Sequence, residues 1–351
     1  MMNYRIVTKT LLAVSLLAGT TVSAGFSHVT MAAPFIDEDE NKLSVADLDP
    51  ALIEQAKEAL KRLIKDKEVE LTDVREDKLN KKLFLRTAEE KTKLSADGRY
   101  NDEAVVTFDL DTKKVVAVRA AAKLASVDAG FKQKAEAFLK DVNKNAGKYS
   151  YRDIIQVGLD MQTKNWEFIA DKFWLRLNED GSIVRGTFDD YPLEQAGHAL
   201  KNGQQALKDA SIPNVKLTRA NRGINVTPAG SIKKSDMLML QDSMMANYMV
   251  SVGAKTGKVY GLTLGNDMAS GTKQDIEEQF KKPYYTTEQA IDRAQPTVKK
   301  LFGIELKGSQ VDIKANAYTF TKKNQSTVKI QINEKGKIFA YEQFPVNGTM
   351  E

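Results

Sequence analysis

Cysteine is absent from the 351 residues of this chain. The protein therefore has no disulfide bond, no cysteine nucleophile and no cysteine that carries a lipid anchor. An HExxH pattern is absent as well, which excludes a zinc peptidase of that kind. Beyond Ile36, no stretch approaches the roughly 18 consecutive apolar residues of a membrane-spanning helix. We expect that part of the chain to be water-soluble.

The first 36 residues have a different character. Arg5 and Lys9 precede an uncharged run that contains the apolar segment LLAVSLLAG and then small residues. A charged start, an apolar centre and a small-residue end are typical of a secretory signal peptide. We predict a signal peptide over 1–32, with cleavage after Ala32 or, alternatively, after Ala24. An uncleaved membrane anchor is the other interpretation.

Charge excludes a further class of partner. The chain carries 52 basic and 47 acidic residues, a formal net charge of +5. A nucleic-acid binder usually shows a strongly basic face, so we expect no nucleic-acid partner. With the signal removed, we predict a secreted protein, extracellular or associated with the cell wall, that makes no membrane contact.

Four segments of the sequence resemble one another, and each reads as the bend of a β-hairpin. Set in register, they align Val115, Ile183, Val259 and Ile338. Three of the bends carry a glycine, which tolerates the positive φ of tight hairpins; these are Gly181, Gly257 and Gly336. The first bend has Lys113 instead, which predicts a longer turn or a turn of another type.

A helix is predicted upstream of each bend. PALIEQAKEALKRLIK and FKQKAEAFLKDV place apolar residues on one stripe of a helix. PLEQAGHAL and TTEQAIDRA open the other two helices, with Asp190 and Thr286 as the expected N-caps. Pro296 should kink the fourth helix or break it in two.

Each unit thus reads as a helix, two strands, a bend and a further strand. The pattern predicts an α+β fold of tandem repeats, in which a helix packs on a small antiparallel β-sheet. A three-stranded unit has a thin core, so neighbouring units should pair. The predicted repeats span 45–124, 125–190, 191–264 and 284–345, with 265–283 as a linker before the fourth repeat.

The helix start YTTEQAIDRA and the hairpin VSVGAKTGKVYGL resemble the PepSY family of small α+β modules. The exported, tandem arrangement is similar to the YcdB/YcdC-type repeat proteins of spore-forming Gram-positive bacteria. This resemblance covers residues 45–345. It implies a non-catalytic module that regulates secreted peptidases or assists their folding.

Residues suited to catalysis or metal binding are few. His198 lies on the flank of a predicted helix, which favours a solvated surface histidine over a general base. The segment LNEDGSI has calcium-loop spacing but lacks the later glutamate, which favours a hairpin. Five methionines between Met237 and Met249 suit core packing, a Cu(I) site or an adaptable protein-binding surface. We predict no catalytic residue, no metal site and no cofactor.

Trp174 is the side chain that most suggests a contact with another molecule. In the strand FWLRL, the alternation that sends Phe173 and Leu175 inward sends Trp174 outward, flanked by Lys172 and Arg176. An exposed aromatic ring between cations is suited to gripping a peptide or stacking on a sugar. The alternative is that Trp174 packs between neighbouring repeats.

Three functions remain open at this point. The first is a non-catalytic binding module that regulates or assists secreted peptidases, or binds another cell-surface protein. The second is a structural protein of the cell envelope or the spore. The third is a carboxylate-dependent wall hydrolase, which predicts a cleft with two converging acids, one of raised pKa. The sequence does not indicate an oligomeric state.

Overall fold

The computed structural model describes residues 43–64, 69–87, 104–121, 129–146, 149–227 and 232–351. The predicted signal peptide over 1–32 lies outside these residues. The described chain folds as two compact units, one ending at Gly186 and the other spanning Thr187–Glu351. No helix among the described residues is both long enough and apolar enough to cross a bilayer.

The unit that ends at Gly186 is built on an antiparallel meander. Seven consecutive strands each pair with the next along the chain. They are β1 (Asp73–Asp77), β2 (Lys82–Arg86), β3 (Ala104–Asp109), β4 (Val115–Ala121), β5 (Ile154–Asp160), β6 (Trp166–Ala170) and β7 (Phe173–Leu177). β8 (Ile183–Phe188) follows at the boundary of the unit, and the helices are α2 (Pro50–Leu63) and α3 (Ala129–Ala146).

The second unit holds an eight-stranded sheet in the order β9-β10-β11-β12-β16-β15-β14-β13, all antiparallel. Its first strands are β9 (Arg219–Val226), β10 (Lys234–Gln241), β11 (Tyr248–Gly253) and β12 (Val259–Leu264). Its later strands are β13 (Gln310–Lys314), β14 (Ala317–Thr321), β15 (Thr327–Ile332) and β16 (Ile338–Phe344). The short β17 (Thr349–Met350) pairs in parallel with the start of β10. The helices are α4 (Gly197–Asp209), α5 (Lys273–Gln279) and α6 (Thr287–Phe302).

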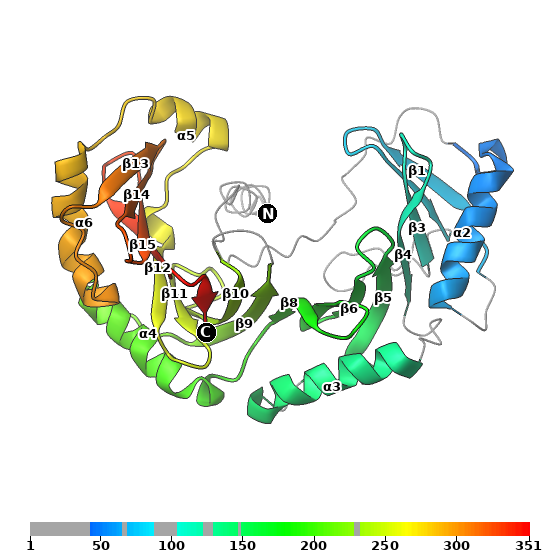
Figure 1. The fold of residues 1–351 in the computed structure, drawn as a ribbon, viewed down its shortest axis with the longest axis horizontal. Helices are drawn as coiled ribbons and strands as arrows, with labels where there is room; N and C mark the ends of the chain where they lie inside the picture. Colours follow the sequence, from blue (N-terminus) through cyan, green and yellow to red (C-terminus); the bar gives the residue numbers. More distant parts are fainter. Residues whose placement is uncertain (1–42, 65–68, 88–103, 122–128, 147–148, 228–231) are drawn as a thin grey trace, which may run out of the picture. The chain divides into compact units, whose positions relative to one another are not determined.

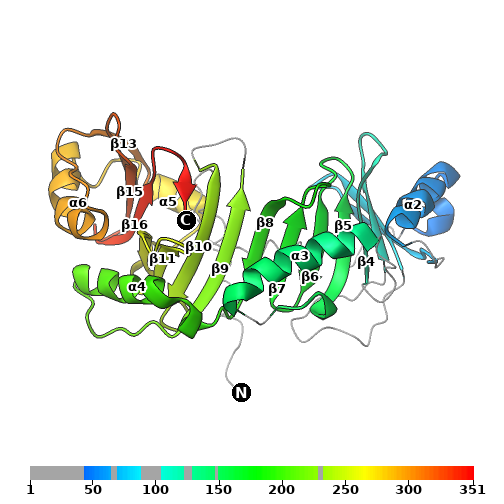
Figure 2. The ribbon, with the colours of Figure 1, turned by 60° about the horizontal axis from the view of Figure 1, so that its bottom comes forward.

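Amphipathic helices form the core by covering one face of each sheet. In the first unit α2 buries Leu52, Ala56, Leu60 and Leu63 and packs on β3, β4 and β5 (Figure 1). In the second, α4 packs on β10, β11 and β12, and α6 packs on β12 and β16 (Figure 2). In β7 of the first unit, the residues that alternate with the buried ones are only half-buried, and the candidate site lies among them.

The predicted fold class was wrong. The described chain is mostly β, with 17 strands and five α-helices, and its sheets are large and antiparallel. β4 and β5, assigned to separate repeats, are hydrogen-bonded from Ala117↔Asp160 to Ala121↔Gln156. β12 and β16 are joined in the same way. Small separate sheets would leave unpaired N–H and C=O groups on their edge strands, and strand pairing between the expected units satisfies those groups.

The predicted helix starts had mixed outcomes. Thr286 is the N-cap of α6, where its hydroxyl accepts from the Gln289 N–H at 3.3 Å. Asp190 is not a helix cap, because α4 begins only at Gly197; its carboxylate instead accepts from Arg219 at 2.6 Å. Pro296 does not divide α6, which runs unbroken through it. Pro296 cannot donate a hydrogen bond to the carbonyl of Asp292, and Asp292 lies on the exposed side of the helix, where water can take the place of that donor.

All four predicted bends are hairpin turns, and they have two lengths: the first and third bends share one, and the second and fourth share the other. In the first, the Asp109 N–H donates to the Lys114 carbonyl at 3.0 Å; in the third, the Gly253 N–H donates to the Lys258 carbonyl at 2.8 Å. Lys113 has φ +57°, close to the +68° of its counterpart Gly257. The first turn is one residue longer than the second and fourth bends, as expected, but Lys113 is not the cause, because the third bend has the same length with Gly257. A lysine here adopts the left-handed conformation usually left to glycine.

The later bends are held by side chains of the preceding helical segment. Lys134 of α3 donates to the Glu179 carbonyl in the second bend. Asn202 of α4 donates to the Gly257 carbonyl at 2.8 Å in the third. Tyr285, just before α6, donates to the Gly336 carbonyl at 2.6 Å in the fourth. These bonds satisfy turn carbonyls and fix each of these three hairpins against its helix.

Candidate functional site

The predicted two-sided character of the strand around Trp174 is confirmed. Phe173, Leu175 and Leu177 are almost completely buried, with exposed fractions of 2%, 0% and 1%. Trp174 and Arg176 alternate with them on the other face of the sheet, and both are half-buried. The strand period thus places an indole and a guanidinium on the face opposite to the core.

Two guanidinium groups flank the Trp174 ring. The Cζ of Arg176 lies 5.5 Å from the ring centroid, and the Cζ of Arg185 in β8 lies 5.6 Å from it. Both distances fall within the range of a cation–π interaction. Lys172, predicted as the other neighbour of Trp174, is exposed in the turn between β6 and β7. The structure therefore joins Trp174 to Arg176, as predicted, and adds Arg185.

A buried carboxylate lies next to this cluster. Glu167 of β6 is 7% exposed and accepts from the Arg176 Nε at 3.1 Å. Its other oxygen, Oε2, accepts from the Arg119 Nη2 at 3.1 Å. Arg119 lies on β4, two strands away, and both residues pair with Gly158 of β5. A Cβ on Gly158 would lie 3.0 Å from the Arg119 Cγ, so the glycine leaves the space through which Arg119 reaches Glu167.

We call these residues the Trp174 surface: Trp174, Arg176, Arg185, Arg119 and Glu167. Three guanidiniums face one carboxylate, so the positive charge is only partly neutralised. Glu167 pairs with Arg119 and Arg176, whereas Arg185 makes no ion pair with any residue of the described chain. Burial, and secondarily the charge of Arg176, lowers the pKa of Arg185. The surface thus holds a partly desolvated cation to which the described part of the chain supplies no counter-charge.

Sequence reasoning missed Arg119, Glu167 and Arg185. The signal for Arg185 lies in the hairpin itself, because Arg176 and Arg185 are close to equidistant from the bend at Gly181 and so reach the same part of the sheet. The sequence around Arg119 gives no comparable signal, since Arg119 reaches Glu167 only because β4 pairs with β5.

The other predicted features do not assemble into a site. Asp180 closes the second bend, where its Oδ1 accepts from the Ser182 N–H at 2.8 Å. Met237 and Met239 are buried in β10, while Met244 and Met245 are exposed, so the methionines do not share one surface. No group of three metal-ligating side chains occurs among the described residues. His198 lies on the exposed side of α4, as predicted.

Among the residues that the structure describes, one carboxyl group has a raised pKa. Burial raises the pKa of Glu342 in β16, and the neighbouring Lys329 opposes this rise. The Lys329 Nζ lies 3.7 Å from the Glu342 Oε2. The raised pKa therefore belongs to a carboxylate that faces a lysine, which differs from the pair of converging acids expected of a wall hydrolase.

Neither a protein-family model nor a curated protein matches this chain.

Proposed function

We propose that the protein is a secreted, non-catalytic binding protein whose Trp174 surface holds an acidic segment of a partner polypeptide. The observation that carries this proposal is Arg185, a half-buried guanidinium that lies against Trp174 without an ion-pair partner in the described chain. A carboxylate of the partner would supply the missing counter-charge in a partly desolvated place, where charge-assisted hydrogen bonds are strong.

The composition of the surface supports a polypeptide partner. Tryptophan and arginine are the residues that most often dominate the energy of protein–protein contacts. Trp174 offers a large ring whose position is already fixed by two cation–π contacts, so little side-chain freedom is lost on binding. Nucleic acid is the weaker candidate, because the chain as a whole is nearly balanced in charge.

The resemblance to PepSY-type proteins supports a secreted peptidase as the partner, with another cell-surface protein as the alternative. A structural role in the cell envelope or the spore is the second candidate function, since it also requires contact surfaces and no reaction centre. The wall hydrolase is the weakest of the three, because the carboxylate of raised pKa faces a lysine.

The test measures binding of a labelled acidic peptide, Ac-Glu-Asp-Leu-Glu-Asp-Leu-NH₂, to the chain from Ala33 onward by fluorescence anisotropy. A peptide with Gln and Asn in place of Glu and Asp is the neutral comparison. Trp174→Ala and Arg185→Gln should each weaken binding of the acidic peptide by about 1–3 kcal/mol. Arg152→Gln, which removes an exposed arginine of the same unit, is the matched control and should have little effect.

Equal binding of the acidic and neutral peptides, or equal losses in Arg152→Gln and Arg185→Gln, would contradict the proposed surface. A second measurement tests the partner class. The chain is mixed with peptidases purified from the culture medium of its source, and their activity is followed with and without Trp174→Ala. A change in peptidase activity that the variant abolishes supports a peptidase partner. Casein or peptidoglycan hydrolysis by the chain alone would refute the non-catalytic assignment.

A further inference from the structure

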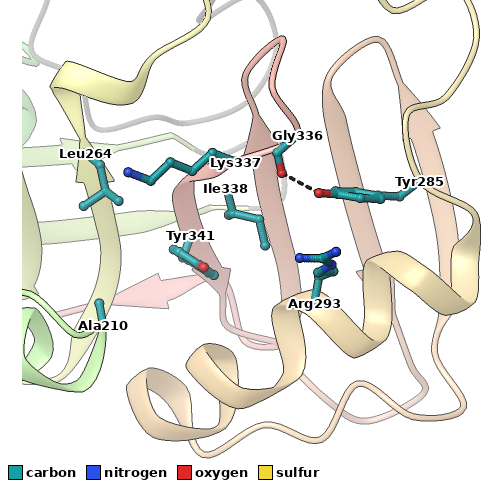
Figure 3. Close-up of a pocket in the computed structure, with 8 residues that line it drawn as sticks. All are labelled: Ala210, Leu264, Tyr285, Arg293, Gly336, Lys337, Ile338 and Tyr341. Atoms are coloured by element: carbon teal, nitrogen blue, oxygen red, sulfur yellow. Dashed lines mark hydrogen bonds between the residues drawn. The ribbon is translucent and has the colours of Figure 1, made fainter.

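A cavity of about 290 Å³ lies in the second unit, between α6 and the sheet (Figure 3). Its walls are contributed by α6, the start of β16, the end of β12 and the residue that caps α4. The lining residues are Ala210, Leu264, Tyr285, Arg293, Gly336, Lys337, Ile338 and Tyr341. Figure 3 shows Arg293 rising from α6 beneath the Tyr285 ring, with Ile338 and Tyr341 on the adjoining strand. The volume is at the lower limit for small-molecule sites, so the cavity suits a small ligand or one terminal residue of a peptide.

Tyr285 is fixed in place from three sides. Its N–H donates to the Tyr318 hydroxyl at 2.8 Å, and its own hydroxyl donates to the Gly336 carbonyl at 2.6 Å. Its ring meets that of Tyr284 edge to face, with the centroids 4.9 Å apart. Gly336 leaves room for this packing, because a Cβ there would lie 2.3 Å from the Tyr284 Cε1. The ring next to Arg293 is therefore a rigid wall.

Arg293 is the cation of this cavity that has no acidic partner. Its Cζ lies 5.8 Å from the centroid of the Tyr285 ring, and it makes no hydrogen bond or ion pair with any other described residue. Lys337 is already paired, with its Nζ 2.6 Å from the Asp267 Oδ2. The cavity thus presents one guanidinium, whose donors are unused by the protein, beside the apolar side chains of Leu264 and Ile338.

We propose that this cavity binds an apolar monocarboxylate, with the carboxylate on Arg293 and the hydrocarbon part against Leu264, Ile338 and Tyr341. The planar guanidinium matches a carboxylate with two parallel hydrogen bonds. A single unpaired cation favours a monoanion over a doubly charged phosphate. Two sources carry this chemistry: the C-terminal residue of a peptide that ends in an aliphatic side chain, and a free short-chain acid.

Arg293 also borders a second hollow, of about 360 Å³, which is lined by Tyr285, Gln289 and Asp292. The carboxylate of Asp292 disfavours an anion on that side. The first cavity has no acidic residue in its lining, so the ligand carboxylate should approach Arg293 from there.

The test is titration calorimetry of the chain from Ala33 onward with three probes: Ac-Ala-Leu with a free carboxylate, the same peptide as its C-terminal amide, and 4-methylpentanoate. The free acid should bind at least about tenfold more tightly than the amide, because only the acid carries a charge that pairs with the exposed Arg293 guanidinium. Arg293→Gln should weaken binding of the free acid by about tenfold. Lys300→Gln removes an exposed cation of the same helix and should leave the affinity unchanged.

The two sources are separated by the third probe. Binding of 4-methylpentanoate as tight as that of the peptide acid assigns the site to free acids, and much weaker binding assigns it to peptide C-termini. Equal affinity for acid and amide, no binding of any probe at millimolar concentration, or an unchanged affinity in Arg293→Gln would each overturn the proposal. Melting curves of both variants show whether the fold is retained. The acidic-peptide test of the Trp174 surface concerns the other unit, so its result is independent of the result for this cavity.

Discussion

Arg119 donates to Glu167 across the bare backbone of Gly158, so that a side chain of β4 pairs with a carboxylate of β6 over the strand between them. The same carboxylate accepts from Arg176 on the far side. This row crosses four strands and gives two of the three guanidiniums of the Trp174 surface an ion-pair partner. Arg185 is left as the cation available to a partner.

Gly158 should be sensitive even to the smallest side chain. Gly158→Ala places a Cβ 3.0 Å from the Arg119 Cγ and 3.3 Å from the Val118 carbonyl oxygen, and should therefore displace Arg119 from Glu167. We expect a loss of about 1–2 kcal/mol in the free energy of unfolding, measured by urea denaturation. Gly261→Ala is the matched control, since its Cβ would meet no atom closer than 3.5 Å. Equal effects of the two substitutions would show that Arg119 does not depend on the space at Gly158.

Trp174 should be accessible to anions and Trp166 should not, because Trp166 is only 4% exposed. In a Trp166→Phe background, the remaining emission reports Trp174 alone. Iodide should quench this emission more strongly than caesium, since Arg176 and Arg185 attract the anion. The difference should shrink at high salt. Blue-shifted emission that iodide does not quench would mean that Trp174 is buried and would remove the basis of the Trp174 surface.

Lys113 in the first bend and Gly257 in the third occupy the same left-handed turn position, so opposite substitutions at the two sites test that position. Gly257→Val should cost about 1–3 kcal/mol, because Val resists a φ of +68° and its side chain meets Asn202. Lys113→Gly should stabilise the protein by about 0.5–1 kcal/mol, because it relieves a non-glycine residue at φ +57°. Thermal unfolding measures both. Unchanged melting in both variants would indicate that the two turns differ from the conformations described.

Asp109 should contribute to acid sensitivity. Hydrogen bonds from the Thr112 N–H and hydroxyl, followed by one from Lys82, lower the pKa of Asp109 from 3.8 to about 2. The folded chain therefore binds this proton less tightly than the unfolded chain. Ionised Asp109 thus adds stability above pH 3.8, and this contribution is lost as the pH falls towards 2.

Urea denaturation between pH 5 and pH 2 measures this effect. Asp109→Asn should make the fall in stability below pH 3.8 less steep than in the wild type. Thr112→Val removes the hydroxyl donor and should shift the Asp109 pKa upward in an NMR titration. A wild-type acid slope in Asp109→Asn would assign the acid sensitivity to other carboxylates.

Much of the local structure was determined by the sequence itself. The apolar stripe of α2, the Thr286 cap and the alternation around Trp174 were all predicted and are all present. Each depends on neighbours within a few residues, since helix and strand periods fix which side chains share a face. The four bends are also determined by neighbouring residues. The left-handed conformation of Lys113 was not predicted, because the identity of a turn residue does not show how much backbone strain the turn tolerates.

Only the tertiary structure decided how the strands join. The pairing of β4 with β5 turned the expected separate units into one sheet, and it also brought Arg119 to Glu167, two residues that are far apart in the sequence. Within the described residues, Arg185 and Arg293 have no acidic partner for the same reason, because such pairing depends on which acids other segments bring near. Strands pair through backbone hydrogen bonds, which are largely independent of side-chain identity. The alternation of apolar and polar residues therefore determines which face of a strand is buried, but it does not determine which strand lies beside it.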